Sequence, residues 1–217
     1  MNVVLHYRGS EKDAHALCSE LNSLRPDSAD TLQCDLLQTP RLGELVQKAA
    51  DRWGTLDAVV NNASAFQPSP VGHVTEHQWD ELVGSNMKAP FFIAQAAAPM
   101  LKARRGCIVN ILDIYAERPL KNYPVYSAAK AGLAALTRAL AKELAPEVRV
   151  NAVSPGAIIW PDDDPGAQEK QAIVARILLK RPGRPADLAK AVLFLINDSD
   201  YITGEVIAVD GGRSLFI

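Results

Sequence analysis

Short apolar runs alternate with helix-forming segments along this 217-residue chain, and this alternation constrains its fold more than any other feature. The valine-rich run NVVLHY at 2–7 is typical of a buried parallel strand. Strand and helix following each other throughout predict an α/β fold with helices on both faces of a parallel sheet, as a single domain over 1–217. Further strands are expected at 30–36, 56–63, 106–112, 148–156 and 205–212, and helices at 11–24, 41–54, 77–105 with a bend near Pro90, 126–145, 169–180 and 185–198.

The composition fits an ordinary soluble globular protein, with 48% hydrophobic and 22% charged residues. A net charge of −2 gives no reason to expect a nucleic acid or an anionic membrane as a partner. No apolar run is long enough to span a bilayer, and the start lacks a signal-peptide pattern, so we expect a cytoplasmic protein. The three cysteines are expected to be free thiols, and the four histidines lack metal-ligand spacing, so no metal is expected.

Tyr126 and Lys130 stand four residues apart in YSAAK, at the start of a strongly helix-forming segment. Residues at this spacing lie on one helix face, so the ammonium is expected to lower the pKa of the phenol. A tyrosine tuned in this way can donate a proton to a substrate near neutral pH. Asp113 follows the apolar run CIVNIL, at the carboxyl end of an expected strand, where open α/β sheets bind their ligands.

Five motifs resemble those of the short-chain dehydrogenase/reductase family over nearly the whole chain. They are NNAS at 61–64, Asn86 in GSNMKAP, YSAAK at 126–130, VNAVSPG at 150–156 and YITGEVIAVDGG at 201–212. The resemblance implies a Rossmann-like doubly wound sheet, catalysis by Tyr126 and Lys130, and a homotetramer. It also implies that Asn86, at a local helix irregularity, holds a water that connects Lys130 to solvent.

Arg8 and Ser10 follow the first strand, where nucleotide-binding folds read the ribose of the cofactor. An arginine and a hydroxyl without a carboxylate suit a 2′-phosphate, which favours NADPH. By resemblance, Asp35 meets the adenine amino group, and Asn61 stabilises the sheet. The other residues that the resemblance places along the cofactor are Leu36, Asn62, Ala63, Ser64, Tyr126, Lys130, Pro155, Gly156 and Ile158.

Within this family the chain most resembles pteridine reductases. Most members carry a serine at the position of Asp113, whereas pteridine reductases carry an aspartate that can protonate a pterin nitrogen once burial raises its pKa. Phe66 follows the NNAS motif and is expected to stack on a flat heteroaromatic substrate. The substrate-binding residues expected on this basis are Ser64, Phe66, Asp113, Tyr126 and Trp160, for a pterin as the small-molecule substrate.

A glycine-rich turn of the form G-x-x-x-G-x-G, which holds the cofactor pyrophosphate in such folds, does not occur in this sequence. The chain starts at what resembles the family's second strand, so we expect Met1 to be an artefact and an upstream strand, turn and helix to exist. The absent strand would lie between 2–7 and 56–63. We therefore expect two unpaired strand edges, bare apolar surface and weak NADPH binding.

Two other functions remain open at this point. One is a short-chain reductase that acts on a carbonyl, such as a 3-oxoacyl reductase, and the other is a truncated chain that is not catalytic and binds no cofactor. The polar stretch at 160–168 is expected to be a substrate lid, because the family has its substrate loop there.

Overall fold

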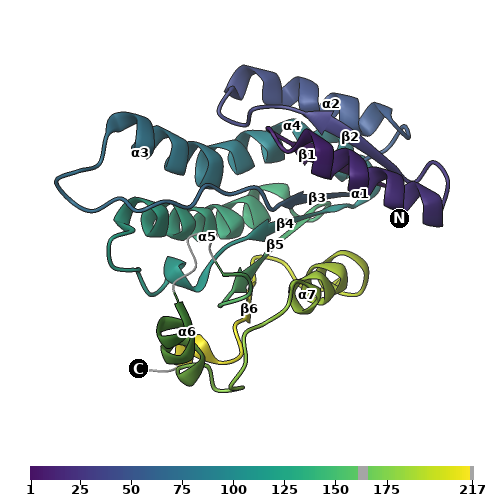
Figure 1. The fold of residues 1–217 in the computed structure, drawn as a ribbon. Coiled ribbons are helices and arrows are strands. Elements are labelled where there is room, and N and C mark those ends of the chain that lie inside the picture. Colours follow the sequence, from purple (N-terminus) through teal and green to yellow (C-terminus); the bar gives the residue numbers. More distant parts are fainter. Residues whose placement is uncertain (161–165, 216–217) are drawn as a thin grey trace.

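The computed structural model describes residues 1–160 and 166–215 and is an α/β fold of parallel strands covered by helices (Figure 1). All the observed strand pairs are parallel, which confirms the expected fold class. The strands in the described ranges are β1 (Val3–Tyr7), β2 (Ala29–Gln33), β3 (Ala58–Asn61), β4 (Cys107–Ile111), β5 (Arg149–Pro155) and β6 (Val206–Val209).

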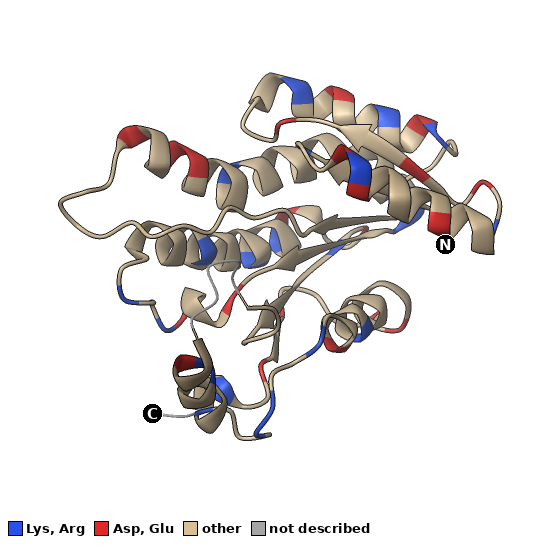
Figure 2. Ribbon diagram, viewed as in Figure 1, with Lys and Arg blue, Asp and Glu red and all other residues tan. Residues whose placement is uncertain are grey.

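The helices lie close to the expected positions. Their bounds are α1 (Glu11–Leu24), α2 (Leu42–Asp51), α3 (Glu76–Val83), α4 (Ala89–Arg104), α5 (Pro124–Leu144), α6 (Gly166–Ala175) and α7 (Pro185–Asn197). None of the helices in the described ranges is long and apolar enough to cross a bilayer. Helices α1, α2 and α7 carry charged residues of both signs, whereas α3 carries only acidic and α4 only basic charged residues (Figure 2).

The long helical stretch expected at 77–105 contains a π-helical segment, Gly84–Lys88, directly before Pro90, near which a bend is expected. Two local expectations are wrong. The second strand ends at Gln33, short of the end expected at 35–36, because the Asp35 carboxylate accepts the Leu37 N–H at 3.0 Å and closes a turn. Helix α6 spans Gly166–Ala175 and not 169–180, since the backbone leaves the helix through two short turns that follow Ala175.

Strands β4 and β5 form the centre of the core, and nearly all of their side chains are buried. Their apolar side chains pack on one face against α4 and α5, where Leu101, Ala141 and Leu144 are buried. On the other face Val109 and Val153 pack against Leu195 of α7. Both faces of this part of the sheet are therefore covered by helices, as a parallel sheet requires.

The strands form two separate sheets within the described residues, one of β1 and β2 and one in the order β3-β4-β5-β6. Strand β1 pairs only with β2 and β3 pairs only with β4, so each keeps one edge without a strand partner among the described residues. These two strands are also more exposed than β4 and β5, with Val3 37% and Val60 42% exposed. The expected unpaired edges and bare apolar surface are thus confirmed.

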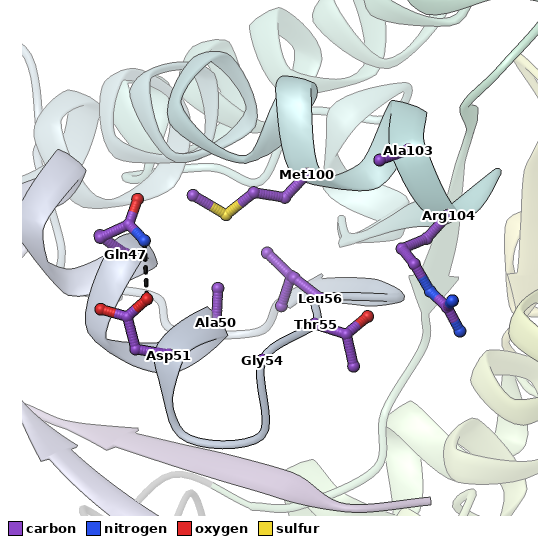
Figure 3. A pocket seen from close by; sticks show the side chains of 9 residues that line it. All are labelled: Gln47, Ala50, Asp51, Gly54, Thr55, Leu56, Met100, Ala103 and Arg104. Carbon is purple, nitrogen blue, oxygen red and sulfur yellow. Dashed lines mark hydrogen bonds between the residues drawn. The ribbon is translucent and has the colours of Figure 1, made fainter.

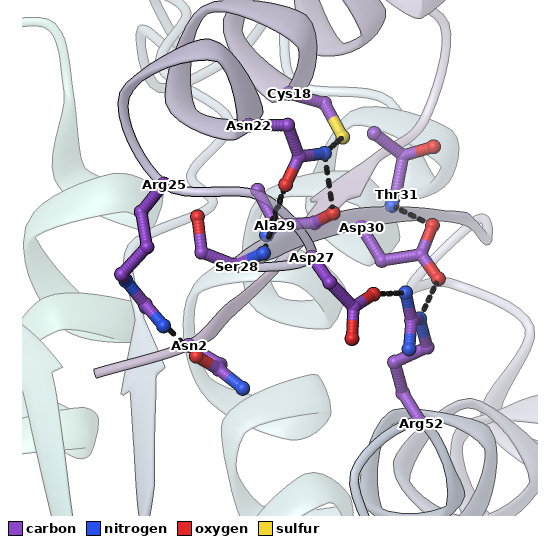
Figure 4. A network of polar contacts seen from close by, with 10 residues as sticks. All are labelled: Asn2, Cys18, Asn22, Arg25, Asp27, Ser28, Ala29, Asp30, Thr31 and Arg52. Carbon is purple, nitrogen blue, oxygen red and sulfur yellow. Dashed lines mark hydrogen bonds and ion pairs between the residues drawn. The ribbon is translucent and has the colours of Figure 1, made fainter.

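Polar side chains from the end of α2 and from α1 hold the segment around the start of β2. Arg52, at the C-terminal end of α2, pairs with Asp30 at 2.7 Å and also with Asp27 (Figure 4). Asn22 of α1 accepts the Ser28 N–H at 2.8 Å and donates to the Ala29 carbonyl at 2.9 Å. The β1–β2 sheet is therefore fixed by polar contacts as well as by packing.

A cavity of about 260 Å³ lies between α2 and α4, at the end of the fold where β3 begins (Figure 3). Met100, Leu56 and Ala50 line it, and the Thr55 hydroxyl beside it is buried without a hydrogen-bond partner. Because β3 enters the sheet at its amino end here, this cavity lies away from the carboxyl ends of the strands, where α/β folds bind ligands.

A chain of buried amides links two strands to α5. Asn61 donates to Asn110 at 2.8 Å, and Asn110 donates to the Thr137 hydroxyl at 2.9 Å. Thr137 in turn donates to the Leu133 carbonyl at 2.8 Å. The role in stabilising the sheet that the resemblance implies for Asn61 is consistent with these contacts.

We predict that Asn110→Ala lowers the free energy of unfolding by about 1–3 kcal/mol, because it removes the hydrogen-bond partner of the Asn61 amide and one of the two partners of the buried Thr137 hydroxyl. Urea denaturation measures this loss. Gln47→Ala, which removes an exposed contact with Asp51, serves as the control and should cost little. Equal stability of the Asn110 variant and the parent would contradict the importance of this chain.

Candidate active site

The site lies where β4 ends and α5 begins. Strand β4 ends at Ile111, so Asp113 follows it at the carboxyl edge of the sheet. Pro124 occupies the first turn of α5, where its missing N–H costs nothing, and the helix then places Tyr126 and Lys130 on one face. Strand end and helix start thus bring a carboxyl group, a phenol and an ammonium together.

Tyr126 and Asp113 form the central contact. The Tyr126 hydroxyl donates a hydrogen bond to Asp113 Oδ2 at 2.9 Å, while Asp113 Oδ1 accepts the Tyr115 N–H at 3.0 Å. Tyr126 is only 4% exposed. Both oxygens of the carboxyl group are therefore held, and its orientation relative to the phenol is fixed.

The pKa values of this pair differ in part from expectation. Burial raises the pKa of Asp113, as expected, although the Tyr115 N–H and the Tyr126 hydroxyl oppose the shift. The pKa of Tyr126 is also raised, first by burial and then by the nearby Asp113, so the expected lowering is wrong for the structure as it stands. The hydrogen bond from the Tyr126 hydroxyl favours the carboxylate form of Asp113, whereas that carboxylate disfavours ionisation of the phenol.

Lys130 does not reach the phenol oxygen in the expected way. Its Nζ donates to the Ile111 carbonyl at 2.9 Å and lies 5.7 Å from the centre of the Tyr126 ring. The side chain is only 2% exposed, and burial lowers its pKa to about 8 while Asp113 opposes that shift. The ammonium is thus held at the end of β4, close to the Tyr126 ring.

Asn86 lies inside the π-helical segment, which confirms the local helix irregularity. Its side-chain amide donates to the Leu82 carbonyl at 2.9 Å and to the Ala65 carbonyl at 2.8 Å. Its oxygen accepts the Ser64 hydroxyl at 2.6 Å, and Ser64 opposes the raised pKa of Tyr126. Ser64 therefore connects Asn86 to the catalytic tyrosine, and the water relay stays a prediction.

Phe66 lies at the site, 45% exposed, in the loop that follows β3. Its ring stacks on Tyr123 with centroids 4.6 Å apart and meets the Tyr126 ring at a steep angle at 4.8 Å. Tyr123 therefore covers one face of Phe66. Part of the Phe66 side chain nevertheless stays accessible to a ligand.

The residues expected at the adenosine end follow β1 and β2. Arg8 is exposed and pairs with Glu81 of α3 at 3.3 Å. Ser10 precedes α1, and its hydroxyl makes no capping hydrogen bond. Asp35 closes the turn described above, and Leu36 packs against the core. Arg8 must leave Glu81 before it can bind a 2′-phosphate.

The residues expected near the nicotinamide end follow β3 and β5. Asn62 and Ala63 are exposed directly after β3, and Pro155 ends β5. Gly156 lies so close to Asp210 that an added Cβ would come within 2.8 Å of it, and Ile158 packs over Gly183. The centre of the Trp160 ring lies 5.6 Å from Nζ of Lys170. The rest of the expected lid, 161–165, lies outside the described residues.

A dinucleotide cofactor, which this fold implies, fits the described residues only in part. The buried Lys130 and Tyr126 can hold the ribose beside the nicotinamide, and Arg8 can face the adenosine phosphate. The described residues offer no glycine-rich turn between β1 and β3 for the pyrophosphate. They also contain no group of side chains that could bind a metal ion.

Three side chains at the site carry no local sequence signal. Tyr123 stacks on Phe66, and Tyr115 accepts a hydrogen bond from Arg213 at 3.0 Å. Arg213 is 98 residues away from Tyr115 in the sequence, so no spacing rule could pair them. Only the position of Tyr115, two residues after Asp113, could have drawn attention to it.

Residues 1–214 match the family model described as enoyl-(acyl carrier protein) reductase. The chain is 36% identical over 253 aligned residues to pteridine reductase 1 from Leishmania tarentolae, an alignment that covers 98% of this chain and 88% of that protein. It is 34% identical to the 3-oxoacyl-[acyl-carrier-protein] reductase of Staphylococcus aureus, over 97% of this chain and 87% of that protein. The corresponding enzyme of Thermotoga maritima is also 34% identical, over 94% and 84%.

These matches agree with the parallel α/β fold and with the Tyr126–Lys130 pair on α5. They cover almost the whole chain, and they include both pterin and 3-oxoacyl reductases at similar identity. The chain is therefore an oxidoreductase that belongs to the short-chain dehydrogenase/reductase family.

Proposed function

We propose that this protein reduces a C=N bond of a dihydropterin to the tetrahydro form with NADPH, which supplies the hydride when bound. The observation that carries the proposal is the hydrogen bond between Tyr126 and Asp113, whose pKa is raised by burial. A C=N bond becomes CH–NH when carbon takes a hydride and nitrogen takes a proton. A carboxyl group that holds its proton suits this nitrogen better than a serine hydroxyl does.

The protein groups have separate tasks in this reaction. Asp113 and Tyr126 are both protonated before the reaction. One proton passes from this pair to the ring nitrogen, the pair keeps the other proton and one negative charge, and solvent restores the proton that was lost. Lys130, fixed on the Ile111 carbonyl, places a positive charge below the pair and favours the anion that forms there. Asn86 accepts the hydrogen bond of the Ser64 hydroxyl, and Ser64 lies close enough to Tyr126 to oppose the rise of its pKa.

The aromatic side chains support a flat substrate. Phe66 is half exposed and its ring lies against Tyr126, so a pterin stacked on it would lie beside the proton donors. The rival is a 3-oxoacyl reductase, favoured by the relatives at 34% identity. Such an enzyme would need only a hydroxyl donor to the ketone oxygen.

We predict that Tyr126→Phe lowers kcat for dihydrobiopterin by roughly 100-fold or more, because a positioned general acid contributes about that much. Steady-state NADPH oxidation measures the loss. Tyr201→Phe, the same change at a fully exposed tyrosine, is the matched control and should retain the parental rate. An unchanged kcat in the Tyr126 variant would remove the proton-donor role.

We predict that Asp113→Asn lowers pterin reduction by about 100-fold, whereas its effect on cofactor binding is small. Asparagine keeps an oxygen for the Tyr115 N–H, but it has no acidic proton, and its NH2 group stands in place of the oxygen that accepts the Tyr126 hydroxyl. Kinetics with dihydrobiopterin and titration of NADPH separate the two effects.

Asp113→Ser distinguishes the rival reaction. If the parent chain reduces a 3-oxoacyl thioester faster than dihydrobiopterin, and the serine variant retains or increases that activity, the pterin assignment is wrong. Reduction of dihydrobiopterin by both variants at the parental rate would also contradict it.

A further inference from the structure

The C-terminal segment presents one arginine to the active site. Strand β6 ends at Val209, and Asp210 then accepts the N–H groups of Gly212 at 2.8 Å and Ser214 at 2.7 Å. Gly211 and Gly212 both adopt positive φ angles, 63° and 81°, which allow the chain to reverse sharply. The turn is therefore fixed by its own hydrogen bonds, and it fixes the backbone of Arg213.

The guanidinium of Arg213 is directed to Tyr115. Its Nη2 donates to the Tyr115 hydroxyl at 3.0 Å, and its central carbon lies 5.6 Å from the centre of that ring. Arg213 is partly buried and forms no ion pair with any carboxylate that the structure describes. Its contact through Nη2 is thus with a neutral group.

Tyr115 connects this guanidinium to the reacting groups. Its N–H binds Asp113 Oδ1, while its hydroxyl is bound by Arg213, so one side chain separates the two. The charge of Arg213 also reaches Asp113, where it opposes the raised pKa of the carboxyl group. Arg213 therefore lies next to the catalytic pair, on the side formed by the C-terminal segment.

A guanidinium has five N–H donors in a plane and binds carboxylate or phosphate oxygens in pairs. Arg213 is partly buried, and the described residues offer its positive charge no carboxylate, so binding of an anion there would be favourable. In the proposed reaction Asp113 and Tyr126 supply the proton to the neutral pterin ring, so the ring itself does not need the positive charge of Arg213. An anionic group attached to the ring would reach past Tyr115 and meet it.

We propose that Arg213 is a specificity-determining residue that binds an anionic group, a carboxylate or a phosphate, carried by the substrate outside its reacting ring. This inference rests on the proposed pterin reduction. It divides the possible substrates into pterins with a neutral side chain and pterins whose side chain ends in an anion, and it assigns the second class to this protein.

The test compares three substrates in the full chain: dihydrobiopterin, whose side chain is neutral, dihydrofolate, which carries carboxylates, and dihydroneopterin monophosphate. Arg213→Gln should raise KM for the anionic substrates by roughly 10-fold or more, the loss of one charge-assisted pair. It should change KM for dihydrobiopterin and all kcat values by less than about twofold, and Arg213→Lys should recover part of the loss. Whether dihydrofolate or the phosphate ester loses more identifies the anion.

Arg104→Gln is the matched control, because this exposed arginine pairs with Asp57 and lies outside the site. Equal losses for the neutral and anionic substrates in Arg213→Gln, or no loss for either, would overturn the proposal. So would a parent chain that reduces dihydrobiopterin and neither anionic substrate.

Equilibrium binding separates this inference from the proposed reaction. Calorimetric titration with folic acid and biopterin requires no turnover, and p-aminobenzoyl-glutamate probes the anionic tail alone without any variant. If the parent reduces no pterin but binds folic acid more tightly than biopterin, and Arg213→Gln removes the difference, the anion site stands and the reaction is wrong. If the parent binds none of folic acid, the tail and dihydroneopterin monophosphate, the anion site is wrong whatever the reaction.

Discussion

The hydrogen bond between Tyr126 and Asp113 is the interaction on which the site depends. It joins the carboxyl end of β4 to the first turn of α5, and both are held rigidly. Burial makes the anionic form of either group costly, so each group keeps its proton until a substrate accepts one. Lys130 is tied to the backbone of the same strand and supplies the compensating charge.

The strands in the described residues form two separate sheets, and the residues expected to bind the two ends of the cofactor are divided between them. The region of β3 to β6 and α5 carries the proposed proton donors and the residues expected at the nicotinamide end, whereas the residues expected at the adenosine end follow β1 and β2. The ion pair between Arg8 and Glu81 is one of the contacts between these parts. The proposed proton donors and the expected adenosine contacts therefore lie in different regions, so a change at Asp113 can affect the reaction without affecting the way the adenosine end is held.

Much of the fold follows from the sequence because it rests on local patterns. Helix α1 lies at its expected bounds, and the strands lie within a few residues of theirs, since periodicity and turn residues specify them. The proximity of Asp113 to Tyr126 also follows, because a strand end and a helix start meet at one edge of a parallel sheet. The direction of the Tyr126 pKa does not, since it depends on burial and on the direction in which Lys130 points.

Contacts between distant segments could not be predicted in this way. Arg213 meets Tyr115 across 98 residues and Arg8 meets Glu81 across 73, and neither pair leaves a pattern in the sequence. The stacking of Tyr123 on Phe66 is another case, because Tyr123 looks like an ordinary residue before a helix. These contacts decide which face of the site is open, and so they bear on specificity more than on fold.

Titration of the Asp113 carboxyl group by ¹³C NMR tests the central claim most directly, with Asp113→Asn used to assign its signal. A carboxyl group that retains its proton beside Tyr126 must titrate above its ordinary pKa of 3.8. We expect a raised midpoint in the parent chain, and a further increase in Tyr126→Phe, because the tyrosine hydroxyl stabilises the carboxylate. A midpoint at or below 3.8 would show that Asp113 is an ordinary ionised side chain and cannot protonate a pterin.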